Sequence, residues 1–192
     1  MKLVTDRLRL RPLAAADLPL LVTLDSDPAV MRYINGGQPT PAALYENRLM
    51  ARLLAQAEGP LIGFFVLHRR YDDEPLGWVH NRRYELQPSW LEIGYRLFAR
   101  HWHQGYATEA SRVLRDATFD AALCAHWCAI CEPAHHASRR VMAKLGMQPT
   151  ETYRHRTGIE VIRYELARAA WLSAADRSDQ GGDDWHRGKE QG

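Results

Sequence analysis

One glycine stands where a phosphate-binding helix would begin. In "ARHWHQGYATEA", residues 99–110, Gly105 directly precedes a pattern with helical spacing. The first amides of a helix have no acceptor within the helix, and the helix dipole adds partial positive charge there. Such an end suits an anion, and a glycine lets main-chain amides approach it closely. An ordinary turn before a helix fits these residues equally well, because the chain has neither a P-loop nor a dinucleotide-binding glycine pattern.

The overall charge of the chain gives no reason to expect a nucleic-acid partner. Its 192 residues include 25 Lys and Arg against 23 Asp and Glu, a formal net charge of +2. Positive charge for an anion site must therefore be local. No apolar run matches a signal peptide or a membrane-spanning helix, so we expect a cytoplasmic protein with no membrane partner.

The spacing of apolar residues predicts an α+β domain over residues 1–172. Helices are expected at 14–34, 39–59, from Gly105 onward and at 136–146, and strands at 8–13, 60–70, 74–85, 90–98, 125–131 and in a pair through 152–166. The strand at 90–98 and the helix after Gly105 bring a strand end and a helix start to one spot. Residues 173–192 lack periodicity, which predicts a disordered tail.

Several segments resemble the GCN5-related N-acetyltransferase (GNAT) superfamily. "LEIGYRLFARHWHQGYATEA" resembles its acetyl-CoA-binding core, and is most similar to the branch that acetylates the N-termini of ribosomal proteins. "TDRLRLRPLAAADLPLL", "HHASRRVMAKLGM" and "RYELARAAW" resemble further parts of that branch, in the family's order. The resemblance implies a three-layer fold, in which helices cover both faces of a mixed, mostly antiparallel, twisted central sheet. A parallel strand pair should splay apart at its centre.

The resemblance also implies acetyl-CoA as the acyl donor and no metal. The implied coenzyme-binding residues are Leu97, Ala99, His103, Gln104, Gly105, Tyr106, Ala107, Thr108, His135 and Ser138. The pantetheine arm would bond to the main chain at Leu97 and Ala99, and an amide near Tyr95 would face the thioester oxygen. His103 and His135 depart from the family, which usually has glycine and asparagine at these positions.

The family's chemistry is direct attack of an amine on the thioester carbonyl. It requires a neutral amine, a donor for the developing oxyanion and a proton for the leaving thiolate. We expect Glu92 to be the general base, although a solvated carboxylate on a strand is the alternative. The acid is left unassigned, because Met142 stands where many relatives have a tyrosine. Ser138, Tyr153 and His155 are weaker candidates.

Three cysteines offer a competing interpretation. Cys124, Cys128 and Cys131 have the spacing of a radical S-adenosylmethionine [4Fe–4S] site, and nearby histidines make zinc conceivable. Their run is strand-like, however, and alternation would place Cys124 and Cys128 on one face and Cys131 on the other. We therefore expect structural thiols.

The acceptor is predicted only as a primary amine, either a protein N-terminus or a small molecule. A non-catalytic acyl-CoA sensor or interaction module of the same fold is the alternative. "MRYINGGQPTP" and the hairpin "YRHRTGIE" are expected to surround the acceptor. One of Arg139, Arg140 and Lys144 is a candidate for a CoA phosphate contact, and either a monomer or a homodimer fits.

Overall fold

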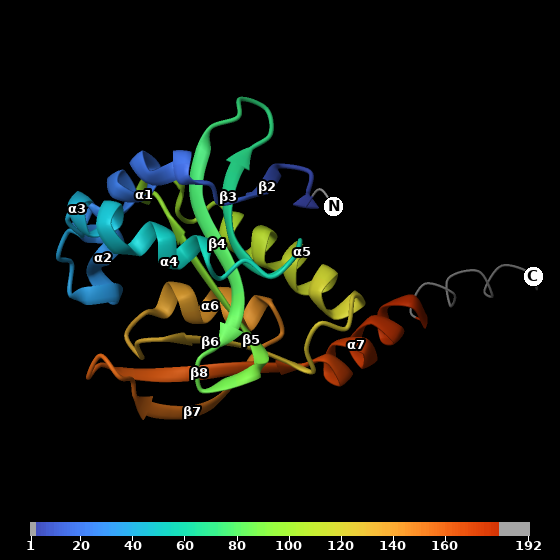
Figure 1. Cartoon of the computed structure of the whole chain (residues 1–192). Coiled ribbons are helices and arrows are strands. Elements are labelled where there is room, and N and C mark those ends of the chain that lie inside the picture. Colours follow the sequence, from blue (N-terminus) through green and yellow to red (C-terminus); the bar gives the residue numbers. More distant parts are fainter. Residues whose placement is uncertain (1–2, 181–192) are drawn as a thin grey trace, which may run out of the picture.

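The computed structural model describes residues 3–180, which form one eight-stranded sheet with helices packed against it (Figure 1). The strands are β1 (Leu3–Val4), β2 (Leu8–Pro12), β3 (Gly63–Arg69), β4 (Pro75–Tyr84), β5 (Gln87–Leu97), β6 (His126–Cys131), β7 (Gln148–Arg154) and β8 (Glu160–Ala167). Their spatial order is β1-β2-β3-β4-β5-β6-β8-β7. Only β5 and β6 pair in parallel within this sheet, and every other neighbouring pair is antiparallel.

The helices are α1 (Leu18–Asp25), α2 (Pro28–Asn35), α3 (Ala42–Leu44), α4 (Met50–Leu54), α5 (Tyr106–Asp120), α6 (His136–Lys144) and α7 (Arg168–Gln180). A π-helical turn at Tyr45–Leu49 joins α3 to α4, and 3₁₀ turns lie at Ala15–Asp17 and Ala99–His101. This arrangement confirms the predicted mixed, mostly antiparallel α+β fold.

Two apolar clusters form the core, one on each face of the sheet. Alternate residues of a strand point to opposite faces, so Phe64 and Phe65 of β3 belong to different clusters, as do Trp78 and Val79 of β4. The larger cluster includes residues of α5 and α6, and the smaller one those of α1, α2 and α4. A strand buried on both faces is therefore apolar throughout, as β3 is.

The second predicted helix, at 39–59, is shorter than expected and irregular. It begins at Ala42, contains the π-helical turn and ends at Leu54. Tyr45, the first residue of that turn, is buried, and its hydroxyl donates to the Asp25 carboxylate. The π-helical turn therefore coincides with the residue whose side chain is buried and bonded to α1.

The predicted boundary at residue 172 falls inside a helix. α7 continues to Gln180, past the expected boundary, and the disorder expected of residues 173–192 stays a prediction. The indole of Trp171 packs against Phe119 and donates to Asp116, which fixes the first turns of α7 on the domain. Residues 181–192, the rest of the expected tail, lie outside the described residues. Across 3–180, no helix is both long and apolar enough to cross a membrane.

Candidate active site

The central parallel strands stay together for only two residues. Leu91 pairs with Trp127 and Glu92 with Cys128, and beyond these positions β5 and β6 are no longer paired. β5 nevertheless continues to Leu97 while bonded to β4 on its other side. The splayed pair expected at the centre of the sheet is therefore present, and it leaves one edge of β5 open over residues 93–97.

Main-chain groups of alternate residues face this open edge. The Phe98 amide donates to the Leu76 carbonyl of β4 at 3.0 Å, so the main-chain groups of Leu97 and Tyr95 point the other way. The Leu97 carbonyl already accepts the Trp102 indole N–H at 2.9 Å, which leaves its amide for a ligand. Ala99 lies in a 3₁₀ turn and its carbonyl accepts the Trp102 amide, so the extended edge ends two residues earlier.

The start of α5 lies just beyond that edge. Gly105 is the N-cap and has a φ of 83°, a left-handed conformation that favours glycine. The first bond within the helix runs from the Glu109 amide to the Gly105 carbonyl, so the amides of Tyr106, Ala107 and Thr108 have no helical acceptor. The Gly105 cap lacks a side chain, and α5 begins with free amides as the sequence predicts.

The loop before Gly105 has an unusual backbone at one residue. His103 is exposed and has a φ of 61°, which explains why glycine is common at this position in the family it resembles. Gln104 is held by its neighbours, because its side chain donates to the Arg100 carbonyl and its own carbonyl accepts Arg7 Nη1. His101 is buried against Glu74, so it does not face the start of α5.

An open hollow of about 670 Å³ adjoins Gly105 and Thr108. Three cationic side chains line it, Arg7, Arg112 and Lys144, together with Asp6 and Glu109. Arg7 is engaged by Glu109, whereas Arg112 and Lys144 are exposed and form no ion pair with any described residue. Both are free to meet a phosphate at the helix start. Of the three cations suggested on α6, Lys144 is the one that reaches this hollow.

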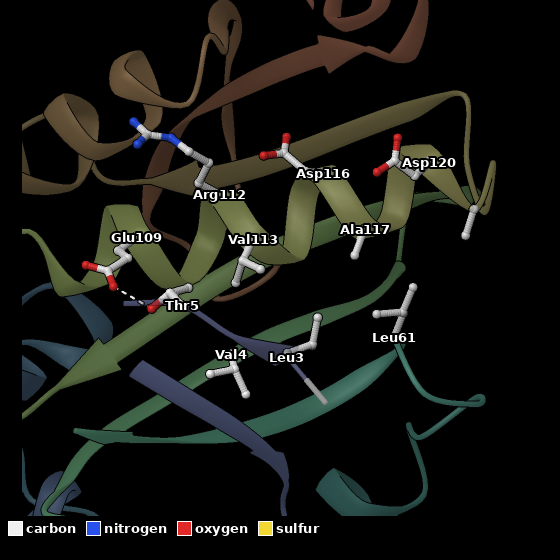
Figure 2. Close-up of a pocket in the computed structure, with 11 residues that line it drawn as sticks. Leu3, Val4, Thr5, Leu61, Glu109, Arg112, Val113, Asp116, Ala117 and Asp120 are labelled. Carbon is white, nitrogen blue, oxygen red and sulfur yellow. Dashed lines mark hydrogen bonds between the residues drawn. The ribbon is translucent and has the colours of Figure 1, made fainter. Parts of the chain in front are cut away.

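A second groove, of about 580 Å³, lies along α5 (Figure 2). Leu3, Val4 and Leu61 face Val113 and Ala117 across it, and Glu109, Asp116 and Asp120 also line it. These carboxylates outnumber its one cation, Arg112. The groove is therefore a poorer phosphate site than the hollow at the helix start.

His135 and Ser138 lie at the start of α6, which follows β6 in the chain. The His135 ring stacks on Tyr33 of α2, with centroids 4.2 Å apart, and burial lowers its pKa. The Ser138 hydroxyl lies 2.9 Å from the Tyr95 hydroxyl of β5. Stacking holds the His135 ring but leaves its Nδ1 without a hydrogen-bond partner among the described residues, whereas the Ser138 contact lets Tyr95 link the open strand to α6.

Glu92 is the last paired residue of β5 before the splay. It is only 5% exposed, and Arg82 Nη2 lies 3.0 Å from its Oε2. Burial raises the pKa of Glu92, and the charge of Arg82 partly offsets that effect. The carboxylate is therefore held in place and is a stronger proton acceptor than an exposed glutamate. The alternative of a solvated carboxylate is wrong.

The sequence profile of the acetyltransferase (GNAT) domain matches residues 7–148, about three quarters of the chain. The chain belongs to the GNAT acetyltransferase family. The matched span includes the open edge of β5, the start of α5 and all of α6.

Individual relatives support the same family. YkkB of Bacillus subtilis is 32% identical over 160 residues, which cover 80% of this chain and 88% of YkkB. FsC-acetyl coenzyme A-N(2)-transacetylase of Aspergillus fumigatus is 29% identical over 187 residues, or 88% and 77% of the two chains. A structure of the ribosomal L7/L12 alpha-N-protein acetyltransferase RimL with coenzyme A has a TM-score of 0.74 at 17% identity, covering 88% and 99%. This last likeness concerns the fold.

One buried histidine of this GNAT domain was not singled out from the sequence. His80 of β4 is 7% exposed and its ring lies within 3.8 Å of Glu92. Its register partner is Gly94 of β5, whose missing side chain makes room for the ring. A histidine inside the apolar run "LGWVHN" was the available signal, but its distance from Glu92 depends on strand register.

The remaining candidate acids and thiols are accounted for by packing. The Tyr153 hydroxyl lies 2.9 Å from that of Tyr84, and His155 bonds to Thr157 in the β7–β8 turn. All three cysteines are buried, but Cys124 packs in the same cluster as Cys131 and apart from Cys128. The expected facing of Cys124 is wrong, because β6 begins only at His126. Within residues 3–180, no group of three or more potential ligands could hold a metal ion.

Proposed function

We propose that this GNAT protein transfers an acetyl group from acetyl-CoA to a primary amine. The observation that carries the proposal is the splay of β5 from β6 after Glu92. It opens a strand edge that ends near a helix start with free amides. A pantetheine arm contains amides that bond to such an edge, and a pyrophosphate suits such a helix start.

In this arrangement the coenzyme's phosphates lie at the amides of residues 103–108. Lys144 and Arg112 supply nearby positive charge from the exposed surface. The pantetheine arm follows the open edge toward Tyr95, with the Leu97 amide as one donor. Ala99, His135 and Ser138 remain proposed contacts: His135 Nδ1 has no hydrogen-bond partner among the described residues, whereas the Ser138 hydroxyl would have to share or release Tyr95.

The reaction places the thioester near the Tyr95 amide, which donates to the carbonyl oxygen as negative charge develops there. Glu92 lies two residues before Gly94 on the same strand and receives the proton that the amine must lose. The acceptor approaches from the face of the sheet that carries α1 and α2, because Glu92 and its partner Arg82 lie on that face with Trp78. The two acceptor classes that fit are a protein N-terminal α-amine, as in the ribosomal-protein branch, and a small-molecule amine.

Replacing Glu92 with glutamine tests this assignment. We expect kcat to fall about 100-fold with an acceptor of pKa ~10.4, while the KM for acetyl-CoA stays nearly unchanged. An α-amine of pKa ~7.8 is about 14% neutral at pH 7, so the fall should be smaller with a peptide N-terminus. Steady-state kinetics with an alanine-starting peptide, kanamycin, spermidine and lysine would measure both effects.

Glu58→Gln is the matched control. Glu58 also pairs with an arginine of β4, Arg83, but that pair lies on the surface. Equal losses in the two variants would remove Glu92 from the mechanism. A wild-type protein that binds coenzyme A but acetylates no amine in this panel would instead favour the acyl-CoA-binding module.

A further inference from the structure

His80 is a buried histidine without a hydrogen-bond partner. His80 is only 7% exposed, yet neither its Nδ1 nor its Nε2 forms a hydrogen bond with any described residue. A buried polar group left unpaired costs about 1–3 kcal/mol, so its retention calls for an explanation. Aromatic packing holds the ring, since Phe64 contacts it edge-on at 4.9 Å and Trp78 stacks on it at 5.6 Å between centroids.

The ring reaches from β4 across to β5 at the splay. A Cβ atom on Gly94 would lie 2.6 Å from His80 Cε1 and 2.7 Å from its Nε2. The Nε2 edge of the imidazole therefore covers the β5 main chain at Gly94, between Glu92 and Tyr95. Glu92 is the last residue paired with β6, and Tyr95 is the proposed position of the thioester. His80 thus lies beside the place where the amine must attack.

The distance between Glu92 and His80 allows one small polar group to form a hydrogen bond with both side chains. His80 Nε2 is 3.8 Å from Glu92 Oε1, too far for a direct hydrogen bond. A single nitrogen atom could lie about 2.9 Å from both His80 Nε2 and Glu92 Oε1 and so form a hydrogen bond with each. Arg82 bonds to the other carboxylate oxygen, so Oε1 is left for such a group. An incoming ammonium has three N–H donors and can meet both acceptors at once.

The charged groups around His80 keep the ring neutral. Burial lowers its pKa well below the ordinary value, and the charges of Arg82 on β4 and Arg96 on β5 lower it further. Arg96 is itself paired with Asp25 of α1, and the Glu92 carboxylate lies 3.8 Å from the ring. A neutral imidazole with a free nitrogen is able to accept a proton.

We propose that His80 takes the second proton lost by the acceptor nitrogen, the one released as the N–C bond forms, after Glu92 has taken the first proton from the ammonium and while it holds the same nitrogen in place. This inference rests on the proposed acetyl transfer. Glu92 Oε1 first takes one proton from the bound ammonium and passes it to water, which leaves a neutral amine. As the N–C bond forms, a second N–H bond breaks and its proton moves to Nε2. The C–S bond then breaks with its electron pair on sulfur. The imidazolium returns the proton through water to the thiolate, so that coenzyme A leaves as the thiol and His80 is neutral again.

His80→Gln is the direct test, with His68→Gln as the matched control. His68 of β3 is also buried, at 8% exposure, and also has an unpartnered Nε2 in the described structure, but it bonds to the Asp73 carbonyl away from the splay. We expect His80→Gln to lower kcat by about 100-fold or more, with an unchanged KM for acetyl-CoA. His68→Gln should leave kcat close to the wild-type value, because His68 lies away from the splay and touches neither Glu92 nor Gly94 in the described contacts.

A pH profile separates proton transfer from structure. Wild-type kcat should fall as the pH drops below the ordinary histidine range, because the pKa of His80 is lowered. His80→Gln should remove this contribution and leave only the acidic limb of Glu92, whose pKa burial raises. Should that variant not fold, Gly94→Ala decides, since its Cβ must push the ring aside while keeping the imidazole. Its kcat should fall similarly.

Two results would overturn the inference: a folded His80→Gln or Gly94→Ala protein with near wild-type kcat, or an equal loss in His68→Gln. Wild-type protein that acetylates none of the four amines would overturn the proposed function itself. Active wild type with an inactive Glu92→Gln and an active His80→Gln would leave Glu92 as the sole base.

Discussion

Gly105→Asp is expected to weaken coenzyme A binding about 100-fold. The new carboxylate would lie at the start of α5, beside the proposed position of two phosphates. Like charges about 5 Å apart near a protein surface repel by about 3 kcal/mol, which corresponds to a loss of roughly 100-fold in affinity. Calorimetric titration of coenzyme A into wild type and variant measures the difference.

Gly105→Asn isolates the charge. Asn and Asp have the same shape, and both tolerate the left-handed conformation at a φ of 83° better than other side chains. We expect the asparagine variant to bind within about tenfold of wild type, because it adds bulk but no charge. If the two variants bind coenzyme A equally, no phosphate lies at this helix start.

Asp25→Ala is expected to lower the free energy of unfolding by about 3–5 kcal/mol. Asp25 is 2% exposed, and its Oδ2 accepts both Arg96 Nη1 and the Tyr45 hydroxyl. Removing the carboxylate leaves the Arg96 guanidinium, which also packs over Trp78, as a buried charge without its partner. Denaturant unfolding followed by circular dichroism measures the loss.

An exposed ion pair supplies the comparison. Glu58 and Arg83 are 3.0 Å apart at the surface, so Glu58→Ala should change stability by less than about 1 kcal/mol. An Asp25→Ala protein as stable as Glu58→Ala would show that the buried network contributes little. Because Arg96 lies on β5, we also expect Asp25→Ala to impair catalysis at temperatures where the variant remains folded.

Local sequence signals predicted the parts of the site that lie within one stretch of chain. The apolar pattern of β5, the glycine at Gly105 and the helical spacing after it are all readable without knowing what packs nearby. They gave a β-loop-α unit that the structure confirms. The splay came from family resemblance, because nothing in the sequence of either strand states where pairing stops.

Contacts between distant segments could not be predicted in this way. The His80–Glu92 spacing depends on the register of β4 against β5, and the Tyr33–His135 stack depends on where α2 crosses the sheet. The expected facing of Cys124 is wrong because Cys124 lies two residues before β6, where the strand alternation no longer applies. The packing of Trp171 against α5, through Phe119 and Asp116, is a further contact of this kind.

Amide hydrogen exchange with and without coenzyme A tests most directly where the coenzyme binds. We expect exchange to slow in peptides that contain residues 93–97 and 103–108, the open edge of β5 and the start of α5. Peptides from β3, which lies two strands away, should be unchanged. Saturating coenzyme A that slows neither region, or slows exchange only along the acidic groove of α5, would contradict the proposed binding mode.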